Sequence, residues 1–394
     1  MSADQPTGAF EARHWSSRID PHRGGEISVF VPFSPRSPGG LEESAALAEA
    51  EHALTVMNSN ATVRRMGRVL SFVEAIASSE FEGVSRPTAR VFDAETAGSA
   101  SDAATQQVVG NVRSMLEAMV PTEPMATHDM LHEWHRQIVG PVVADRGDSG
   151  AYRRVQNWIG LWGSTPLNAS FVPPPPELIG GLMNDLMNFI NDRTLSPIVQ
   201  AAVAHAHFET IHPYGDGNGR VGRSLIYRVL SSRGVVVSAP PPISPALDHG
   251  RDAYVAGLIA YREGRPDIWV NAFANLVVGA CQHSLHLASD VEGLESDWAA
   301  RASDMRAGSV DHRIIRNLID NPVLDAPRVS ASFGVSTTAA RDALRRLGER
   351  DIVIERELAQ GRKGRPAKIF EAKELLDLLD KTPQALAARW QRRR

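Results

Sequence analysis

The sequence contains a single cysteine, Cys281, among 394 residues. One cysteine can form neither an internal disulfide nor a cysteine-based zinc site, so disulfide frameworks and zinc fingers are excluded. No apolar run reaches the length of about 18 residues that a membrane-spanning helix needs. The first residues also lack the charged start and apolar stretch of a secretory signal. We therefore expect a cytoplasmic protein.

Charges of both signs are present but unevenly distributed. Residues 301–394 carry 20 Lys and Arg against 13 Asp and Glu, a balance of +7, whereas residues 1–300 have a balance of −11. A basic segment attached to an acidic body indicates different partners for the two parts, with nucleic acid one candidate for the basic part. The length favours two folded units, and the composition is that of an ordinary globular chain.

Local patterns divide the chain into five parts. We expect an extended N-terminal arm at 1–40, a mainly α-helical body at 41–290, a linker helix at 291–309, a small α+β domain at 310–380 and a basic tail at 381–394. Apolar spacing predicts helices in the body near 41–57, 63–83, 108–118, 127–138, 177–190, 197–210, 219–233, 252–261 and 268–301. Glycines flanking β-favouring residues predict a short hairpin at 150–163.

The most informative segment is glycine-rich and reads Ile-His-Pro-Tyr-Gly-Asp-Gly-Asn-Gly-Arg-Val-Gly-Arg at residues 211–223. Glycines that open a helix let backbone amides approach an anion, which the helix dipole also favours. Arg220 and Arg223 fall on one side of that helix, where both can grip phosphates. Asp216 offers a hard oxygen ligand suited to magnesium. His212 can take up a proton near neutral pH.

This segment differs from the common nucleotide-binding loops. No Gly-Lys-Ser/Thr follows it, as a Walker loop requires, and no strand pattern precedes it, as a dinucleotide fingerprint requires. A base, a metal ligand, amide donors and two arginines within twelve residues instead indicate transfer of a phosphorus group to a hydroxyl.

The segment resembles the motif of the Fic (filamentation induced by cAMP) family, His-Pro-Phe-x-Asp/Glu-Gly-Asn-Gly-Arg-x-x-Arg. It departs from that motif only in Tyr214, which stands in the Phe position and should keep the apolar anchor. The resemblance implies an all-helical Fic fold with a short β-hairpin flap. It also implies AMPylation, in which AMP from ATP is joined to a Ser, Thr or Tyr hydroxyl of a target protein.

The resemblance also assigns roles to individual residues. His212 would deprotonate the hydroxyl, and Asp216 would hold the magnesium that bridges the phosphates. Gly217, Asn218 and Gly219 would form the anion hole, and Arg220 and Arg223 would bind the phosphates of ATP. Val221 and Gly222 are the other expected ATP contacts.

Two further segments fit the nucleotide site of this family. Residues 150–160 resemble the flap, which pairs with the target by strand addition and covers the nucleotide with its tip. The residues carried over as nucleotide neighbours are Asn157, Trp158, Ile159 and Gly160. Tyr254 stands where family members often place an aromatic residue near the adenine, and a core tyrosine is the alternative.

Ser78, Glu82 and Gly83 resemble the family's inhibitory motif, Ser/Thr-x-x-x-Glu-Gly/Asn, on a helix at about 63–83. The resemblance implies that Glu82 pairs with Arg223 and so misplaces the α-phosphate of ATP. An ordinary solvated helix face is the alternative. Removal of AMP, use of another donor, self-modification and a homodimer also stay open.

His128, His132 and His135 lie on one face of the helix expected at 127–138, a spacing that can bind zinc. No clear fourth ligand accompanies them, so we interpret them as core or surface histidines.

The basic C-terminal part resembles a winged helix-turn-helix. Ser336 would begin its second helix, and two strands at 352–355 and 367–370 would flank a basic wing. The candidate DNA contacts are Thr337, Thr338, Arg341, Arg345, Arg362, Lys363 and Arg365. Protein docking or dimerisation is the alternative for this domain, and a transcriptional regulator that only senses nucleotide is the alternative for the whole chain.

Overall fold

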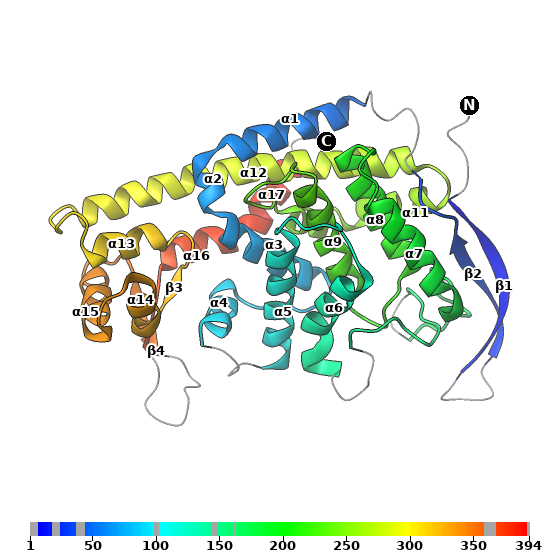
Figure 1. Ribbon diagram of the computed structural model, residues 1–394, viewed down its shortest axis with the longest axis horizontal. Coiled ribbons are helices and arrows are strands. Elements are labelled where there is room, and N and C mark those ends of the chain that lie inside the picture. The colour runs from blue at the N-terminus through cyan, green and yellow to red at the C-terminus, as the bar shows by residue number, and fades with distance from the viewer. Residues whose placement is uncertain are drawn as a thin grey trace. The chain divides into compact units, whose positions relative to one another are not determined.

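The computed structural model describes residues 7–17, 24–36, 44–97, 102–143, 149–160, 163–357 and 368–391 (Figure 1). The chain divides into two compact units. The first comprises Met1–His52, Glu117–Val236 and Gly250–Leu276, and the second Ala53–Leu116, Val237–His249 and Val277–Arg394. Both units consist mainly of helices, which confirms the expected fold class.

The first unit begins with a two-stranded antiparallel sheet, β1 (Gly8–Ser16) and β2 (Gly24–Pro32), as Figure 1 shows. Ile27 and Val29 of β2 are buried against Val172, whereas most of β1 is exposed. The described part of the expected arm is therefore extended, as the sequence indicates, and its two halves pair with each other.

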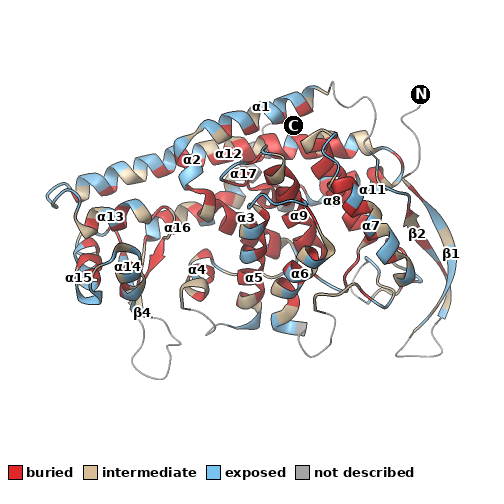
Figure 2. Cartoon of the chain, viewed as in Figure 1, coloured by how far each residue is buried: buried red, intermediate tan, exposed pale blue. Residues whose placement is uncertain are grey.

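The core of the first unit is formed by α8 (Pro197–Ile211) and α9 (Asn218–Ser232), which Figure 2 shows as buried along almost their full length. Helices that are buried all round occupy the interior of a fold rather than its surface. The other helical elements of this unit are α6 (His128–Val143), η2 (Pro176–Leu178), α7 (Ile179–Ile190) and α11 (Arg251–Arg262).

The segment expected to form a short hairpin at 150–163 has a different structure. Among its described residues, Ile159 forms one isolated antiparallel bridge with Phe171, which lies outside the segment. These residues form no strand of two or more residues. The backbone N–H of Arg153 instead donates to Pro213 O at 2.9 Å. The described residues of the segment thus pair with the glycine-rich loop and with Phe171, both of which lie outside it.

The second unit contains α2 (Ala61–Arg65), α3 (Gly67–Phe81), α4 (Thr88–Ala97) and α10 (Ile243–His249). The single helix expected at 63–83 is divided at Met66. At Gly67 an added Cβ would lie 2.1 Å from Ser238 O, so only glycine allows this backbone approach.

The C-terminal part of the second unit combines helices with a small sheet. The helices are α13 (Val310–Asn317), α14 (Ala326–Phe333), α15 (Thr337–Gly348), α16 (Lys373–Asp380) and α17 (Thr382–Gln391). The strands β3 (Val323–Leu324), β5 (Lys368–Glu371) and β4 (Ile354–Glu357) pair antiparallel in that order.

This C-terminal part is tied to α4 by ion pairs. Arg356 bonds both Asp93 and Glu371, and Arg328 donates to Glu95 Oε2 at 3.2 Å. The C-terminal residues therefore share one compact unit with residues 53–116, whereas the sequence pattern presents them as a separate domain.

Three helices cross a boundary between the units: α1 (Ala45–Ser59), α5 (Ala103–Ala118) and α12 (Pro266–Arg301). Cys281 lies buried on α12, and this burial raises the pKa of its thiol. Among the helices that the structure describes, none combines the length and the hydropathy needed to cross a membrane.

Candidate active site

The glycine-rich segment forms the turn between α8 and α9, as its sequence predicts. His212 ends α8 in the left-handed conformation, with φ 49° and ψ 61°, and Gly217 precedes α9 with φ 77°. Two left-handed residues five positions apart reverse the chain within a short loop. The loop therefore places His212 close in sequence and space to the first turn of α9.

Asn218 fixes the shape of this loop. Its Oδ1 accepts from Tyr214 N at 2.8 Å, and its Nδ2 donates to Tyr214 O at 2.8 Å. Asn157 Nδ2 also donates to Tyr214 O, at 3.0 Å. The structure thus gives Asn218 a positioning contact that the sequence did not indicate, and its role in an anion hole stays a prediction.

Asp216 projects into solvent, with its side chain 64% exposed. Its Oδ1 accepts from Gly217 N at 2.5 Å and from Arg220 at 3.3 Å. No group of three or more His, Cys, Asp or Glu able to hold a metal occurs among the described residues. A single reachable carboxylate fits magnesium, which usually keeps several waters and takes other oxygens from substrate phosphates.

Arg220 and Arg223 are each only 1% exposed in the first turns of α9, and Val221 is fully buried beside them. Gly222 has a packing role, because an added Cβ would lie 2.8 Å from Glu209 Oε1 and 3.1 Å from Phe208 Cδ1 of α8. Alanine there would displace the carboxylate end of Glu209, so glycine allows this side chain to lie close against α9. Contact of Gly219, Gly222 or the arginines with ATP stays a prediction.

The side chain of His212 lies beside the last turn of α8, with Nδ1 at 3.7 Å from Glu209 Oε2. Tyr214 is completely buried, as expected of the anchor in the Phe position. Its hydroxyl bonds His132 Nδ1 at 3.1 Å, which satisfies the polar atom that phenylalanine lacks.

Two of the three histidines of α6, His132 and His135, contact this loop, whereas His128 bonds Tyr152 and Asn184. His135 is 2% exposed and stacks on Tyr214, with ring centroids 4.0 Å apart. Gly150 N donates to its Nδ1 at 2.9 Å, so Nε2 carries the proton and donates to Asp216 O at 3.1 Å. Burial lowers the pKa of His135 to about 4, and the ring is therefore neutral at pH 7. The spacing of these histidines predicted their common face but not their partners.

The flap residues carried over from the family resemblance differ in exposure. Asn157 binds the loop, whereas Trp158 and Ile159 are 37% and 39% exposed and Gly160 is also exposed. Trp158 Nε1 donates to Ser164 O at 3.0 Å. Their contact with a nucleotide stays a prediction.

Tyr254 is 7% exposed and lies in an aromatic cluster of the first unit. Its hydroxyl bonds His205 Nε2 at 2.9 Å, and its ring meets Trp269 edge to face at 5.7 Å. These contacts are those of a core tyrosine, the alternative to a place near the adenine.

The residues of the inhibitory motif lie at the end of α3, in the second unit. Ser78 is fully buried, Glu82 is the C-cap of the helix, and Gly83 follows with φ 84°. Arg223 belongs to the first unit, so pairing with Glu82 stays a prediction.

Four candidate DNA contacts, Thr337, Thr338, Arg341 and Arg345, are exposed on α15. Arg345 lies 3.7 Å from Asp342 and 3.9 Å from Glu349, which offset part of its charge. The other three, Arg362, Lys363 and Arg365, lie outside the described residues.

Comparison with known proteins identifies the helical core. The model of the Fic/DOC family matches residues 125–230. Protein adenylyltransferase fic-1 of Caenorhabditis elegans is 32% identical over 133 residues, which are 33% of this chain and 23% of that protein. Protein adenylyltransferase Fic of Drosophila yakuba is 30% identical over 191 residues, 46% of this chain and 35% of that protein. The chain thus matches about a third or less of the length of these relatives.

A solved structure shows the same fold. The crystal structure of a Fic family protein from Desulfovibrio desulfuricans aligns with a TM-score of 0.51 and 17% identity, covering 84% of this chain and 96% of that one. The matched region contains α6, the segment that pairs with the loop, and the complete α8 to α9 turn. Residues 125–230 of this chain therefore form a Fic domain.

Proposed function

We propose that this protein is an adenylyltransferase that moves AMP from ATP to a Ser, Thr or Tyr hydroxyl of a target protein. The observation that carries the proposal is the α8 to α9 turn: His212 ends α8, exposed Asp216 lies in the loop, and Arg220 and Arg223 lie in the first turns of α9. The names of the relatives as protein adenylyltransferases support the same activity.

In the proposed reaction, His212 takes the proton from the target hydroxyl as its oxygen attacks the α-phosphorus of ATP. The bond from the α-phosphorus to the bridging oxygen breaks, and pyrophosphate leaves. Backbone amides at the start of α9, together with Arg220 and Arg223, would offset the phosphate charge. Asp216 would hold magnesium, which supplies further positive charge against the phosphates.

We also propose that Glu82 restrains this activity by pairing with Arg223, as the Ser78 to Gly83 motif suggests. Loss of the carboxylate would then leave the arginine available to the γ-phosphate. The variant Glu82→Gly should therefore transfer more AMP than the natural protein.

The test incubates the natural protein, Glu82→Gly and Glu82→Gly/His212→Ala with magnesium and ATP labelled at the α-phosphate. Label on protein should be strongest in Glu82→Gly and absent from the double variant. Equal labelling of the natural protein and Glu82→Gly would contradict the inhibitory role. No label in any variant that still binds ATP would favour AMP removal, another donor or a nucleotide sensor.

A second function is proposed for the C-terminal part of the second unit. The order α13, β3, α14, α15, β4, β5 is that of a winged helix-turn-helix, and α15 presents exposed Thr337, Thr338 and Arg341. We infer that α15 contacts DNA. A gel shift that weakens with salt and with Arg341→Ala would support this contact, whereas binding of a protein partner that Arg341→Ala abolishes would support docking.

A further inference from the structure

We propose that Arg153 is a positioning residue that holds the backbone of His212 in the left-handed conformation its catalytic position requires. The inference deepens the proposed function, since it rests on His212 being the base. Arg153 lies in the segment between α6 and η2, and its Nε bonds the backbone carbonyl of His212.

His212 needs such support because its backbone is unfavourable for a residue with a Cβ. Among the described residues, only His212 and Asp351 combine a positive φ with a side chain. A left-handed residue that is not glycine persists only where its surroundings fix it. The bond from His212 N to Phe208 O, at 2.9 Å, fixes the N-terminal side of this residue.

Arg153 fixes the other side. Its Nε donates to His212 O at 2.9 Å, and its backbone N–H donates to Pro213 O at 2.9 Å. One residue therefore binds two successive carbonyls directly after the left-handed position. The two remaining nitrogens of the guanidinium donate to Val155 O at 3.1 Å and to Pro174 O at 2.5 Å.

The burial of Arg153 excludes an ordinary surface role. The residue is 5% exposed, and its guanidinium forms no ion pair within 4.0 Å with any residue that the structure describes. Burial lowers its pKa to about 10, with Glu177 acting in the opposite direction, so the group stays charged at pH 7. A buried charge is costly unless hydrogen bonds compensate for the lost water. Here carbonyl oxygens supply that compensation.

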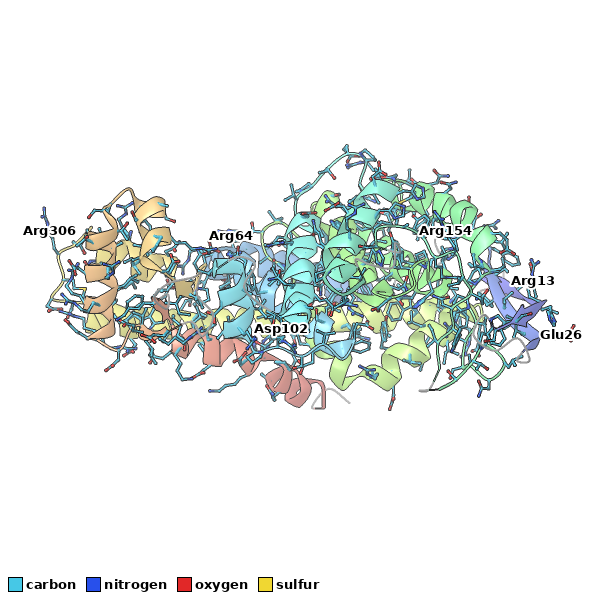
Figure 3. All side chains as sticks on the ribbon, turned by 90° about the horizontal axis from the view of Figure 1, so that it is seen from below. Arg13, Glu26, Arg64, Asp102, Arg154 and Arg306 are labelled. Carbon is cyan, nitrogen blue, oxygen red and sulfur yellow. The ribbon has the colours of Figure 1, made fainter. Side chains whose placement is uncertain are left out.

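The neighbouring residue shows that this arrangement is specific to one position. Arg154 is exposed on the same segment (Figure 3), and no hydrogen bond of its side chain is found in the described part of the chain. Of these two adjacent arginines, Arg153 is therefore buried and structural, and Arg154 lies on the surface. Only the fold distinguishes them.

Two substitutions separate the Nε donor from the charge. Arg153→Gln places an amide nitrogen where Nε now lies, and so can keep the bond to His212 O without the charge. Arg153→Lys keeps the charge but carries no donor at the position of Nε. The control is Arg228→Lys, because Arg228 is a buried arginine of α9 that also donates to carbonyls, those of Glu117 and Val120, away from the loop.

The first measurement is the rate of self-labelling with α-labelled ATP in the Glu82→Gly background, with kcat and KM for ATP determined separately. We expect Arg153→Lys to lower kcat by about 10- to 100-fold, because a small displacement of a catalytic group has effects of that size. KM for ATP should change by less than about twofold, since the proposed phosphate contacts Arg220 and Arg223 lie on α9, away from Arg153. Arg153→Gln should retain more activity than Arg153→Lys, and Arg228→Lys should retain the parental kcat.

A lysine variant as active as its parent, or more active than the glutamine variant, would overturn the inference. A loss of kcat in Arg228→Lys equal to that in Arg153→Lys would do the same, because it would show a general effect of removing a buried arginine.

Crystal structures of both variants, Arg153→Lys and Arg153→Gln, test the inference without any activity. We expect the φ of His212 to leave the left-handed region in Arg153→Lys and to stay near 49° in Arg153→Gln. If the Glu82→Gly parent takes no label, the proposed function has failed, and this conformation alone decides the role of Arg153. An unchanged left-handed His212 in Arg153→Lys refutes that role.

Discussion

Acidification should destabilise the first unit through His207, a histidine in the core helix α8. His207 is 1% exposed, and its Nδ1 bonds the hydroxyl of Tyr261 at 3.1 Å. Burial lowers its pKa from 6.5 to about 3, with Asp185 acting weakly in the opposite direction. The folded protein therefore keeps this imidazole neutral throughout the range in which an unfolded chain protonates it.

The sign and size of the effect follow from this difference in pKa. Unfolding takes up a proton at His207 between pH 6.5 and about 3, so the stabilisation is complete above pH 6.5 and is lost as the pH falls. Between pH 7 and pH 5, proton uptake by the unfolded chain alone lowers the free energy of unfolding by about 2 kcal/mol.

The assay is urea unfolding at pH 7 and pH 5, followed by tryptophan fluorescence. The natural protein should lose about 2 kcal/mol more than His207→Gln over this interval, whatever offset the substitution introduces at both pH values. His14→Gln, on the exposed strand β1, should behave like the natural protein. Equal losses in the natural protein and His207→Gln would refute a neutral buried imidazole.

Glycines provide three further predictions. Gly257→Ala should lower the free energy of unfolding, because the new Cβ would lie 2.7 Å from the ring of Trp269. The steric overlap costs about 1–3 kcal/mol, which exceeds the gain in helix propensity. Gly293→Ala should raise the free energy of unfolding by about 0.5–1 kcal/mol, since Gly293 is exposed within α12 and an added Cβ meets no atom within 4 Å. Thermal unfolding measures the change in both variants. Gly222→Ala should displace Glu209 and reduce AMP labelling of the Glu82→Gly protein by about tenfold, and undiminished labelling would argue against this packing role.

Much of the helical structure and the place of the site follow from the sequence. Apolar spacing predicts α8 and α9 to within about two residues, and Pro213 with the following glycines predicts the turn between them. Such local signals depend on residues close together in the chain. They can therefore be recognised without knowing which distant residues pack against the segment.

The supporting residues could not be predicted in this way. His135 and Asp216 are 81 residues apart, and Arg153 and His212 are 59 apart. No local pattern encodes such a pair. The short hairpin expected at 150–163 was replaced for the same reason, because its backbone pairs with a loop that is distant in sequence.

The burial of Cys281 makes the protein a convenient host for spectroscopic probes. A thiol reagent reacts with an exposed thiolate, and Cys281 is both fully buried and held in the thiol form by a raised pKa. A cysteine introduced at an exposed position, such as Val255 on α11, would then be the accessible thiol of the chain. Fluorophores or spin labels could be attached there without first removing the natural cysteine.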